Sequence, residues 1–464
     1  MKRLSRKTVL AGATALVVVA GLAAAWWPDP GPRYHGRSLR YWLTALANDD
    51  YRVRLPAEAA LRNIGPEAVP ELTRALQAED SRLRELWWRL RRRFWPQSVT
   101  PIRADDLAAA AAGELARLGP QATPAAPALA RRIWIEPAAQ ALRGLGPPAI
   151  PALAAVLADP DSRTLNGVAS LLSDDADKAF GPALTNLVPP LLGLLSHPDV
   201  HQRESALRAL PAVGRDNSRV VTAVAARLGS PIATERCFAA KAVAALGPAA
   251  RAAAPALLVL AKSDRPAERL EAARALRQLG VETNTTVAVL CELLDTPECR
   301  WEAASTLGEM GPAASAAIPR LLIMLETDQS HRPSRTPSMA ALALGKLGPA
   351  AVPGLVPLLT NADSDVRVNA AVALTGLGAA GAPAVPGLVK MLRAEDPEEQ
   401  LTAANALAAI GPGAAAAVPE LTRLAQIATI QDVVVGHARS AARDALERIR
   451  GPAAASAAAI EGGD

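Results

Sequence analysis

The stretch that decides the fold is ALGPAARAAAPALLVL, which runs from Ala245 to Leu260. It contains a Gly-Pro pair at Gly247-Pro248 and a second proline at Pro255, both set among good helix formers. Proline is costly inside a helix but not in its first turn, where the missing N–H has no intrahelical partner. Glycine commonly ends helices. The stretch therefore predicts the end of one helix, a turn, and the start of a second helix at Pro255.

The same pattern occurs ten times along the chain. Each glycine is preceded by large apolar residues one and four positions earlier, and in eight of the ten copies by an Ala-Ala pair at positions −8 and −7. Residues with this spacing share one face of a helix, and the small pair predicts that another helix passes close by. The glycines are Gly65, Gly119, Gly146, Gly214, Gly247, Gly280, Gly311, Gly348, Gly378 and Gly411.

The proline that begins the second helix follows the glycine by either eight or five residues, as in the copies at Gly247 and Gly348. The difference is about one helical turn, so we expect the second helix to gain or lose one N-terminal turn. From Gly214 onward successive glycines are 30 to 37 residues apart. Two antiparallel helices in each such unit, stacked along the chain, predict an all-α fold, an α-solenoid of helix pairs.

The unit from Asp363 to Gly378, DSDVRVNAAVALTGLG, resembles HEAT repeats. It is closest to the short bacterial kind that is also found in phycobilisome-lyase-like proteins, and the resemblance covers roughly residues 50–452. In HEAT repeats an arginine at position −11 commonly pairs with an aspartate before it and forms a ladder between repeats. The resemblance implies such a ladder for Arg54, Arg203, Arg236, Arg269, Arg300 and Arg367, with Asp199, Asp264 and Asp365 as candidate partners.

The first residues have the composition of a targeting segment. Lys2, Arg3, Arg6 and Lys7 precede the uncharged 18-residue run 8–25, which ends in three alanines and is followed by two tryptophans. A helix of that length spans about 27 Å, just enough for a thin bilayer. We expect either a membrane anchor, which we favour, or a signal peptide cleaved after Ala25, with twin-arginine export as a minor route.

Either alternative places the rest of the chain outside the cytoplasm. We expect it to be tethered to the inner membrane by residues 8–25 and to face the periplasm, or to be secreted if the segment is cleaved. Without the four basic residues of the segment, the formal net charge of +5 falls to +1. The sequence therefore gives little support for nucleic-acid binding by the body of the protein.

The exported part begins with YHGRSLRYWLTAL, residues 34–46. It resembles the opening of exported HEAT-repeat proteins of planctomycete and verrucomicrobial type, which read approximately Y-x-G-[KR]-x-L-x-x-W-L. The function of that group is generally unassigned, so the resemblance implies location and architecture only. The matching positions are Tyr34, Gly36, Arg37, Leu39, Trp42 and Leu43.

The segment 78–101 interrupts the repeat with a basic and aromatic insertion. It contains the candidate partner-binding residues Trp87, Trp88, Arg91, Arg92, Arg93 and Trp95. One interpretation is an extended helix whose tryptophans cap the exposed core of the first repeat. The others are a surface for a protein partner, since Trp and Arg dominate interface hot spots, and contact with anionic lipid.

These features divide the chain into five parts. Residues 1–27 are the signal peptide or anchor, and 28–49 are a linker and a first capping helix. Residues 50–104 hold the first repeat with its insertion at 78–101, residues 105–452 form the solenoid, and 453–464 are a disordered tail. Four second helices carry an exposed basic residue, which is either solvated or part of a groove for an acidic partner: Arg74, Arg131, Lys390 and Arg423.

The sequence contains no recognisable catalytic or metal-binding pattern. It lacks GxSxG, HExxH, a Walker loop and a GxGxxG motif that follows a strand, its five histidines are scattered, and its three cysteines show no CxxC spacing. We therefore expect no cofactor and no enzyme, but a scaffold that binds a protein partner on its curved helical surface. The alternatives are a lyase-like protein that handles a chromophore or another prosthetic group, and a nucleic-acid-binding groove.

Overall fold

The computed structural model describes residues 32–48, 50–79, 103–158, 161–173, 176–327, 337–426 and 433–450. These residues form helical hairpins in two compact units, Met1–Gly214 and Arg215–Asp464. The predicted all-α solenoid is confirmed. The proposed anchor segment 8–25 and the tail 453–464 lie outside the described residues.

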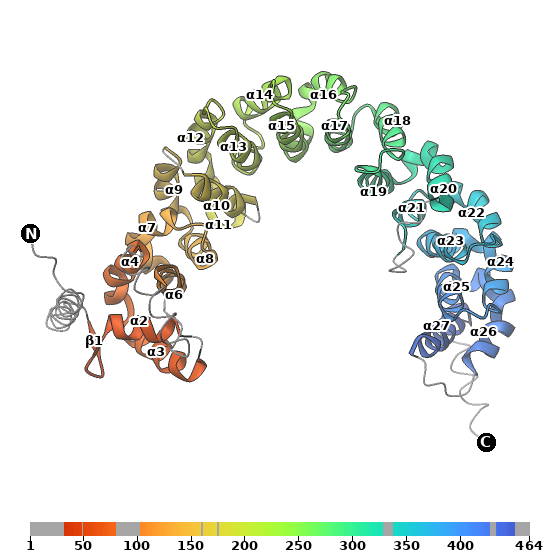
Figure 1. Ribbon diagram of the computed structural model, residues 1–464, viewed down its shortest axis with the longest axis horizontal. Coiled ribbons are helices and arrows are strands. Elements are labelled where there is room, and N and C mark those ends of the chain that lie inside the picture. Colours follow the sequence, from red (N-terminus) through yellow and green to blue (C-terminus); the bar gives the residue numbers. More distant parts are fainter. Residues whose placement is uncertain are drawn as a thin grey trace, which may run out of the picture. The chain divides into compact units, whose positions relative to one another are not determined.

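Unit 1 begins with a two-stranded hairpin and continues as helix pairs. Its strands and α-helices are β1 (Arg33–Tyr34), β2 (Arg37–Ser38), α2 (Leu39–Leu46), α3 (Tyr51–Ile64), α4 (Val69–Gln77), α6 (Ala104–Leu118), α7 (Ala126–Arg131), α8 (Glu136–Leu145), α9 (Ile150–Leu157), α10 (Ser162–Ser173), α11 (Ala176–Phe180), α12 (Val188–Leu194) and α13 (Val200–Val213). The first helix α6 packs on α8, and α10 packs on α13 (Figure 1).

Unit 2 contains only helices among its described residues. They are α14 (Ser218–Ala226), α15 (Ala233–Leu246), α16 (Ala254–Leu260), α17 (Pro266–Leu279), α18 (Thr283–Leu293), α19 (Arg300–Met310), α20 (Ile318–Thr327), α21 (Met339–Leu344), α22 (Val352–Leu358), α23 (Ser364–Leu377), α24 (Val385–Met391), α25 (Pro397–Ile410), α26 (Val418–Ala425) and α27 (Val433–Arg450). The first helices α19, α21, α23 and α25 stack in sequence, with the second helices in an adjacent layer (Figure 1).

The opening motif forms a cap on the first repeat. His35 and Gly36 both have positive φ and turn the chain between β1 and β2, which pair antiparallel. The indole N–H of Trp42 donates to the Tyr34 carbonyl at 3.3 Å, and the Arg37 guanidinium lies 5.6 Å from the Trp42 ring centre. Trp42 is buried, and its helix α2 packs against α3. A tryptophan in the motif itself therefore helps to cover the open end of the solenoid.

Glycine sits between the two helices of a hairpin because of its backbone freedom. Gly247 ends α15 with φ 63° and ψ −145°, a conformation that strongly disfavours residues with a Cβ. The residues from Gly247 to Ala253 then form a 3₁₀ segment, and α16 begins at Ala254 with Pro255 in its first turn. Both prolines of the deciding stretch thus mark the ends of elements, as predicted.

The expected change in length of the second helix is wrong. In the long copy α16 begins one residue before Pro255, and in the short copy α22 begins one residue before Pro353. The three additional residues instead lengthen the connection between the helices. The connection runs over Gly247–Ala253 in the long copy, all in 3₁₀ conformation, and in the short copy over Gly348 and the 3₁₀ segment Pro349–Ala351. The extra turn therefore belongs to the connection, and the second helix keeps its start relative to the proline.

Another hairpin glycine was missed by the sequence pattern. Gly181 has φ 55° and begins the 3₁₀ segment Gly181–Leu187, followed by α12. The pattern is absent there because positions −4, −7 and −8 before Gly181 are Asp177, Asp174 and Ser173. Gly214, by contrast, has φ −145° although it fits the pattern.

Small residues set the closeness of helix packing in the core. Most of the paired alanines at −8 and −7, such as Ala303 and Ala304, are fully buried. A Cβ placed on Gly308 would lie 2.9 Å from the Ala343 Cα, and one on Gly376 would lie 2.9 Å from the Gly345 Cα. The backbones of α19, α21 and α23 therefore approach more closely than any side chain would permit.

Three stretches are long and apolar enough to cross a membrane when judged by length and composition alone. They are Ala233–Leu260, Ser364–Met391 and Pro397–Ala425. Each contains two α-helices joined by a 3₁₀ segment that begins at a glycine with positive φ. In this fold each stretch is a hairpin of the solenoid.

Candidate functional site

The six candidate residues of the insertion, Trp87, Trp88, Arg91, Arg92, Arg93 and Trp95, lie outside the described residues. The site is therefore built from three features that the structure does describe. These are the arginine ladder between repeats, a groove in unit 1, and a stripe on the first helices of unit 2.

The ladder arginines bind the ends of second helices. Arg203 Nη1 donates to the His197 and Pro198 carbonyls at 2.7 and 2.9 Å, and Arg300 Nε donates to the Leu294 carbonyl at 2.8 Å. In the last unit Gln400 takes the same position and donates to the Ala394 carbonyl at 2.7 Å. The last carbonyls of a helix lack intrahelical partners and carry partial negative charge, so a side-chain donor there caps the helix.

Two of these arginines also join neighbouring repeats through a glutamate. Arg236 Nη1 donates to the Ser230 carbonyl at 2.7 Å, and its Nη2 lies 2.5 Å from Glu268 Oε1. Arg367 binds Glu399 in the same way, with Nε 3.0 Å from Oε2. Glu268 and Glu399 lie at position −12 of the following repeat and are almost completely buried. The side chains that link neighbouring repeats are therefore buried between the stacked helices.

These glutamates were missed, although the sequence contained a signal for them. Aspartates were the predicted partners, but Glu268 and Glu399 immediately precede the −11 position of their own repeats. Among the predicted aspartates, Asp199 caps α13 by accepting from the His201 amide at 3.0 Å. The backbone amide of Asp365 donates to the carboxylate of Asp363 at 3.0 Å, so Asp363 caps α23 as Asp199 caps α13. Arg269 binds the exposed Glu292 on α18.

A solvent-facing stripe on four first helices of unit 2 carries no charge. It occupies position −6 on α19, α21, α23 and α25 and position −10 on α19, α23 and α25, and we call it the uncharged stripe. Trp301 is 49% exposed and Leu342 41% exposed, and three further apolar members are half-buried. Because α19, α21, α23 and α25 stack in sequence (Figure 1), equivalent positions lie side by side. The members on these helices are Trp301, Ser305, Leu342, Val368, Val372, Leu401 and Asn405.

On α15 and α17 position −6 is charged and paired, whereas position −10 carries the uncharged Cys237 and Leu270. Lys241 and Arg274 occupy position −6, and both contact Glu271, with Nζ–Oε1 and Nη1–Oε1 distances of 3.6 and 3.4 Å. Arg277 Nη2 lies 2.8 Å from Glu309 Oε2 on α19. The charged side chains on this part of the face are paired with one another, so few of them are left to bind a partner.

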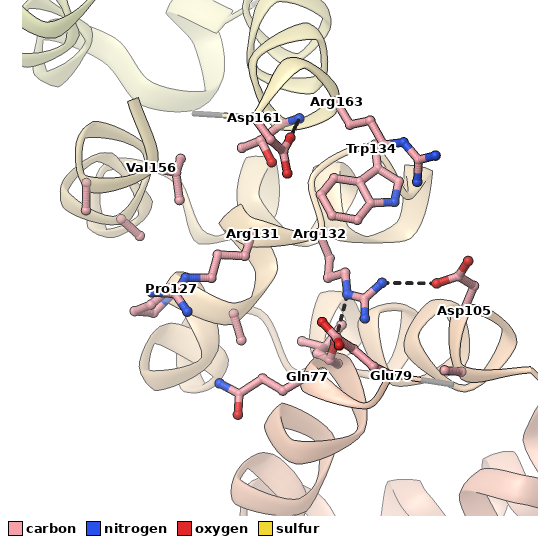
Figure 2. A pocket seen from close by; sticks show the side chains of 16 residues that line it. Gln77, Glu79, Asp105, Pro127, Arg131, Arg132, Trp134, Val156, Asp161 and Arg163 are labelled. Carbon is pink, nitrogen blue, oxygen red and sulfur yellow. Dashed lines mark hydrogen bonds and ion pairs between the residues drawn. The ribbon is translucent and has the colours of Figure 1, made fainter. Parts of the chain in front are cut away.

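Unit 1 contains a groove of about 860 Å³ beside the ends of three successive second helices (Figure 2). Arg132 crosses one side, where Nε and Nη2 donate to the Leu76 and Ala78 carbonyls at 3.0 and 2.8 Å and Nη1 lies 3.0 Å from Asp105 Oδ1. Its lining residues are Leu76, Gln77, Glu79, Ala104, Asp105, Pro127, Ala128, Arg131, Arg132, Trp134, Ala152, Ala155, Val156, Asp161, Arg163 and Thr164.

No group of three or more His, Cys, Asp or Glu side chains that could hold a metal ion occurs among the described residues. The three cysteines are free thiols, and burial raises the pKa of each above its ordinary value. The expected exposure of the four basic residues on second helices is confirmed, because Arg74, Arg131, Lys390 and Arg423 are all exposed.

A family model for HEAT repeats matches residues 254–333 and 352–446. The chain folds as a HEAT-repeat solenoid. Solved structures of Kap95p, the yeast importin-β, are similar to it in fold. Kap95p bound to RanGDP matches with a TM-score of 0.54 and 14% identity over 91% of this chain, and the Kap95–Nup1 complex matches with 0.53 and 14% over 91%. No curated protein matches the sequence.

This chain spans 62% and 63% of the two Kap95p chains. At 14% identity the likeness concerns the fold alone. HEAT-repeat solenoids are typically surfaces for protein interaction, because stacking repeats builds an extended face from many equivalent positions.

Proposed function

We propose that this protein is a non-catalytic scaffold that binds another protein along the uncharged stripe of unit 2. The observation that carries the proposal is the exposed indole of Trp301, aligned with Leu342 and the half-buried Val368 and Leu401 on neighbouring helices. Large aromatic and aliphatic side chains in an uncharged patch are the usual anchors of protein interfaces. The charged and paired face of α15 and α17 limits the site on one side.

The fold supports the same function. Two of the similar structures show Kap95p with a protein partner, RanGDP in one and Nup1 in the other. A solenoid of this type presents equivalent positions from each repeat, so a partner can be bound by several small contacts in a row. We propose this mode of binding here, with the partner lying across α19, α21, α23 and α25.

The proposed location is the exported side of a membrane. The basic residues 2–7, the uncharged run 8–25 and the following Trp26-Trp27 support a tether that holds the solenoid outside the cytoplasm. A reporter fused after Asp464 tests this location, because an exported fusion shows alkaline phosphatase activity. A fusion that is active only as a cytoplasmic reporter contradicts it.

The binding surface is tested by substituting its two most exposed apolar members. The full chain in detergent is used to capture partners from the envelope fraction, and Trp301→Ala/Leu342→Ser should lose a partner that the wild type retains. The matched control is Val259→Ser/Ile323→Ser, because these side chains are 74% and 56% exposed but lie on the second helices. Equal retention by both variants, with unchanged melting curves, would show that the stripe is not the binding surface.

A further inference from the structure

The first hairpin of unit 1 exposes a helix start that is covered in later repeats. Residues 51–56, at the start of α3, are all exposed, and the exposed fractions of Tyr51 and Leu55 are 57% and 56%. The corresponding residues of α23 and α25, at the same distance from the hairpin glycine, include no exposed side chain. The start of α3 is therefore a surface that the packing of repeats leaves free.

The ladder positions of α3 have no preceding repeat to bind. Position −12 is Val53, which is 39% exposed, whereas Glu268 and Glu399 at this position are buried. Position −11 is Arg54, which the resemblance to HEAT repeats placed in the ladder. Its Nε lies 3.6 Å from Glu58 Oε1 in its own helix, and among the described residues it donates to no helix-end carbonyl. Neither position links α3 to an earlier helix pair.

The exposed face of α3 combines a tyrosine and a leucine. Tyr51 and Leu55 are four residues apart and share the face that points away from the buried Ala57 and Ala60. Tyr41, on the neighbouring helix α2, is 45% exposed. Tyrosine is enriched where proteins meet the headgroups of a bilayer, and exposed leucines enter the same layer. These side chains therefore suit a lipid surface.

Positive charge surrounds this face. Residues 33–64 contain six arginines and three carboxylates, a formal charge of +3, whereas the whole part after the targeting segment carries +1. Asp50 caps α3 by accepting the Arg52 amide at 2.9 Å, and Glu58 is paired with arginines of its own helix. The hairpin therefore attracts anionic groups. Three exposed arginines have no carboxylate partner among the described residues: Arg33, Arg40 and Arg52.

The proposed tether ends close to this hairpin. Arg33 follows Trp27 by six positions, and an extended chain of that length spans about 21 Å at most. The 14 residues of α3 have about the same length as a helix. Because tryptophans favour the interface between bilayer and water, a tether ending at Trp27 keeps the first hairpin within about its own length of the lipid headgroups. It thereby gives α2 and α3 a high effective concentration beside the bilayer.

We propose that α2 and the start of α3 lie on an anionic lipid surface. Tyr51 and Leu55 enter the headgroup layer, and Arg40 and Arg52 bind lipid phosphates, which guanidinium groups match with paired N–H donors. Amphipathic surfaces of this kind bind through their buried apolar area together with attraction to anionic lipid. This contact rests on the proposed tether, which brings the hairpin to the bilayer, and does not depend on the uncharged stripe.

The test is photo-crosslinking of the full chain with p-benzoylphenylalanine in place of Leu55, reconstituted into vesicles of equimolar phosphatidylcholine and phosphatidylglycerol. Irradiation should yield phospholipid adducts, which are identified by their mass. Their yield should fall about threefold or more in Arg40→Gln/Arg52→Gln, because two cations beside the probe are lost. Arg131→Gln/Arg163→Gln is the matched control, since it removes the same charge from two exposed arginines elsewhere in unit 1, and it should keep the wild-type yield.

Circular dichroism melting curves establish that each variant is folded, and flotation of the vesicles separates a failed tether from a failed contact. A chain that does not float with the vesicles contradicts the tether and overturns the lipid contact with it. A chain that floats but gives no phospholipid adduct at position 55 overturns the contact alone. So do equal yields in Arg40→Gln/Arg52→Gln and the control, or adducts to a second copy of the chain in place of lipid, which would assign the face to self-association.

Discussion

The first helices of unit 2 differ in how they use the same positions. On α15 and α17 position −6 carries Lys241 and Arg274, which both contact Glu271, Lys241 from the neighbouring repeat and Arg274 from within α17. On α19 to α25 the same position carries an uncharged residue in each first helix: Ser305, Leu342, Val372 and Asn405. Both regions share one fold, a stack of helical hairpins. Repeat packing therefore fixes the buried face of each helix, whereas the residues on the free face decide whether the surface satisfies itself or remains available to a partner.

The largest expected effect is on stability, and it tests whether the buried arginine–glutamate pairs of the two regions differ as their exposed residues do. Arg236→Ala in the charged region and Arg367→Ala in the uncharged region should each destabilise their unit by about 2–3 kcal/mol, because each leaves a buried glutamate without its cation. Arg269→Ala should cost less than about 1 kcal/mol, since its partner Glu292 is 66% exposed. Urea unfolding followed by circular dichroism measures all three.

A large effect of Arg236→Ala with none for Arg367→Ala would mean that the ladder belongs to the charged region only. The two regions would then differ in their buried contacts as well as in their exposed residues, and the exposed residues alone would not explain the difference.

The next effect concerns the close backbone approach beneath the uncharged stripe. Gly308→Ala should destabilise unit 2 by about 1–3 kcal/mol, because its Cβ would lie 2.9 Å from the Ala343 Cα and the helices must move apart. Gly113→Ala is the matched control in α6, where an added Cβ meets nothing within 4 Å. It should stabilise by about 0.5–1 kcal/mol through helix propensity. A lower melting temperature for Gly308→Ala and a higher one for Gly113→Ala would support the close backbone approach at Gly308. Equal shifts in melting temperature would contradict it.

The smallest effect is a change in the pH dependence of unit 1, whose first helices α3 and α6 also carry a charged face. Burial raises the pKa of Glu114, Arg117 opposes the shift with an Nη2–Oε2 distance of 3.3 Å, and Glu58 adds to it. A raised carboxyl pKa favours the protonated folded state. Its contribution to stability is therefore complete below the ordinary pKa of glutamate and is lost as the pH rises through the raised value.

Glu114→Gln should remove that dependence and change stability at neutral pH by less than about 1 kcal/mol. Unfolding midpoints measured across the acidic range for the wild type and the variant provide the comparison. A variant that retains the full slope of the wild type would assign the pH dependence to other carboxyls.

The sequence predicted most of the fold, because the features that define a hairpin are local. Gly247 and Pro255 mark helix ends through backbone chemistry that needs no neighbours. Gly181 was missed because Asp177 stands at position −4, where the other copies have a large apolar residue, and Ser173-Asp174 stands in place of the alanine pair. The length of the 3₁₀ connection was misjudged because a 3₁₀ turn and an α-helical turn add a similar number of residues to the sequence.

The candidate site was harder to predict, because it depends on which helices become neighbours. Trp301 and Leu342 lie 41 positions apart in the chain and share a face only because α19 and α21 stack. The role of Glu399 likewise depends on Arg367 of the preceding repeat reaching across the stack. The basic and aromatic insertion was predicted to bind a partner because its composition is unusual. Partner binding by its six candidate residues stays a prediction.

The most direct test of the account is hydrogen–deuterium exchange of the full chain with and without its captured partner. The account predicts slower exchange on binding in Arg300–Met310, Met339–Leu344, Ser364–Leu377 and Pro397–Ile410, the helices of the uncharged stripe, and unchanged exchange in Ala233–Leu246 and Pro266–Leu279. Protection confined to the two charged helices, with none on the stripe, would contradict it.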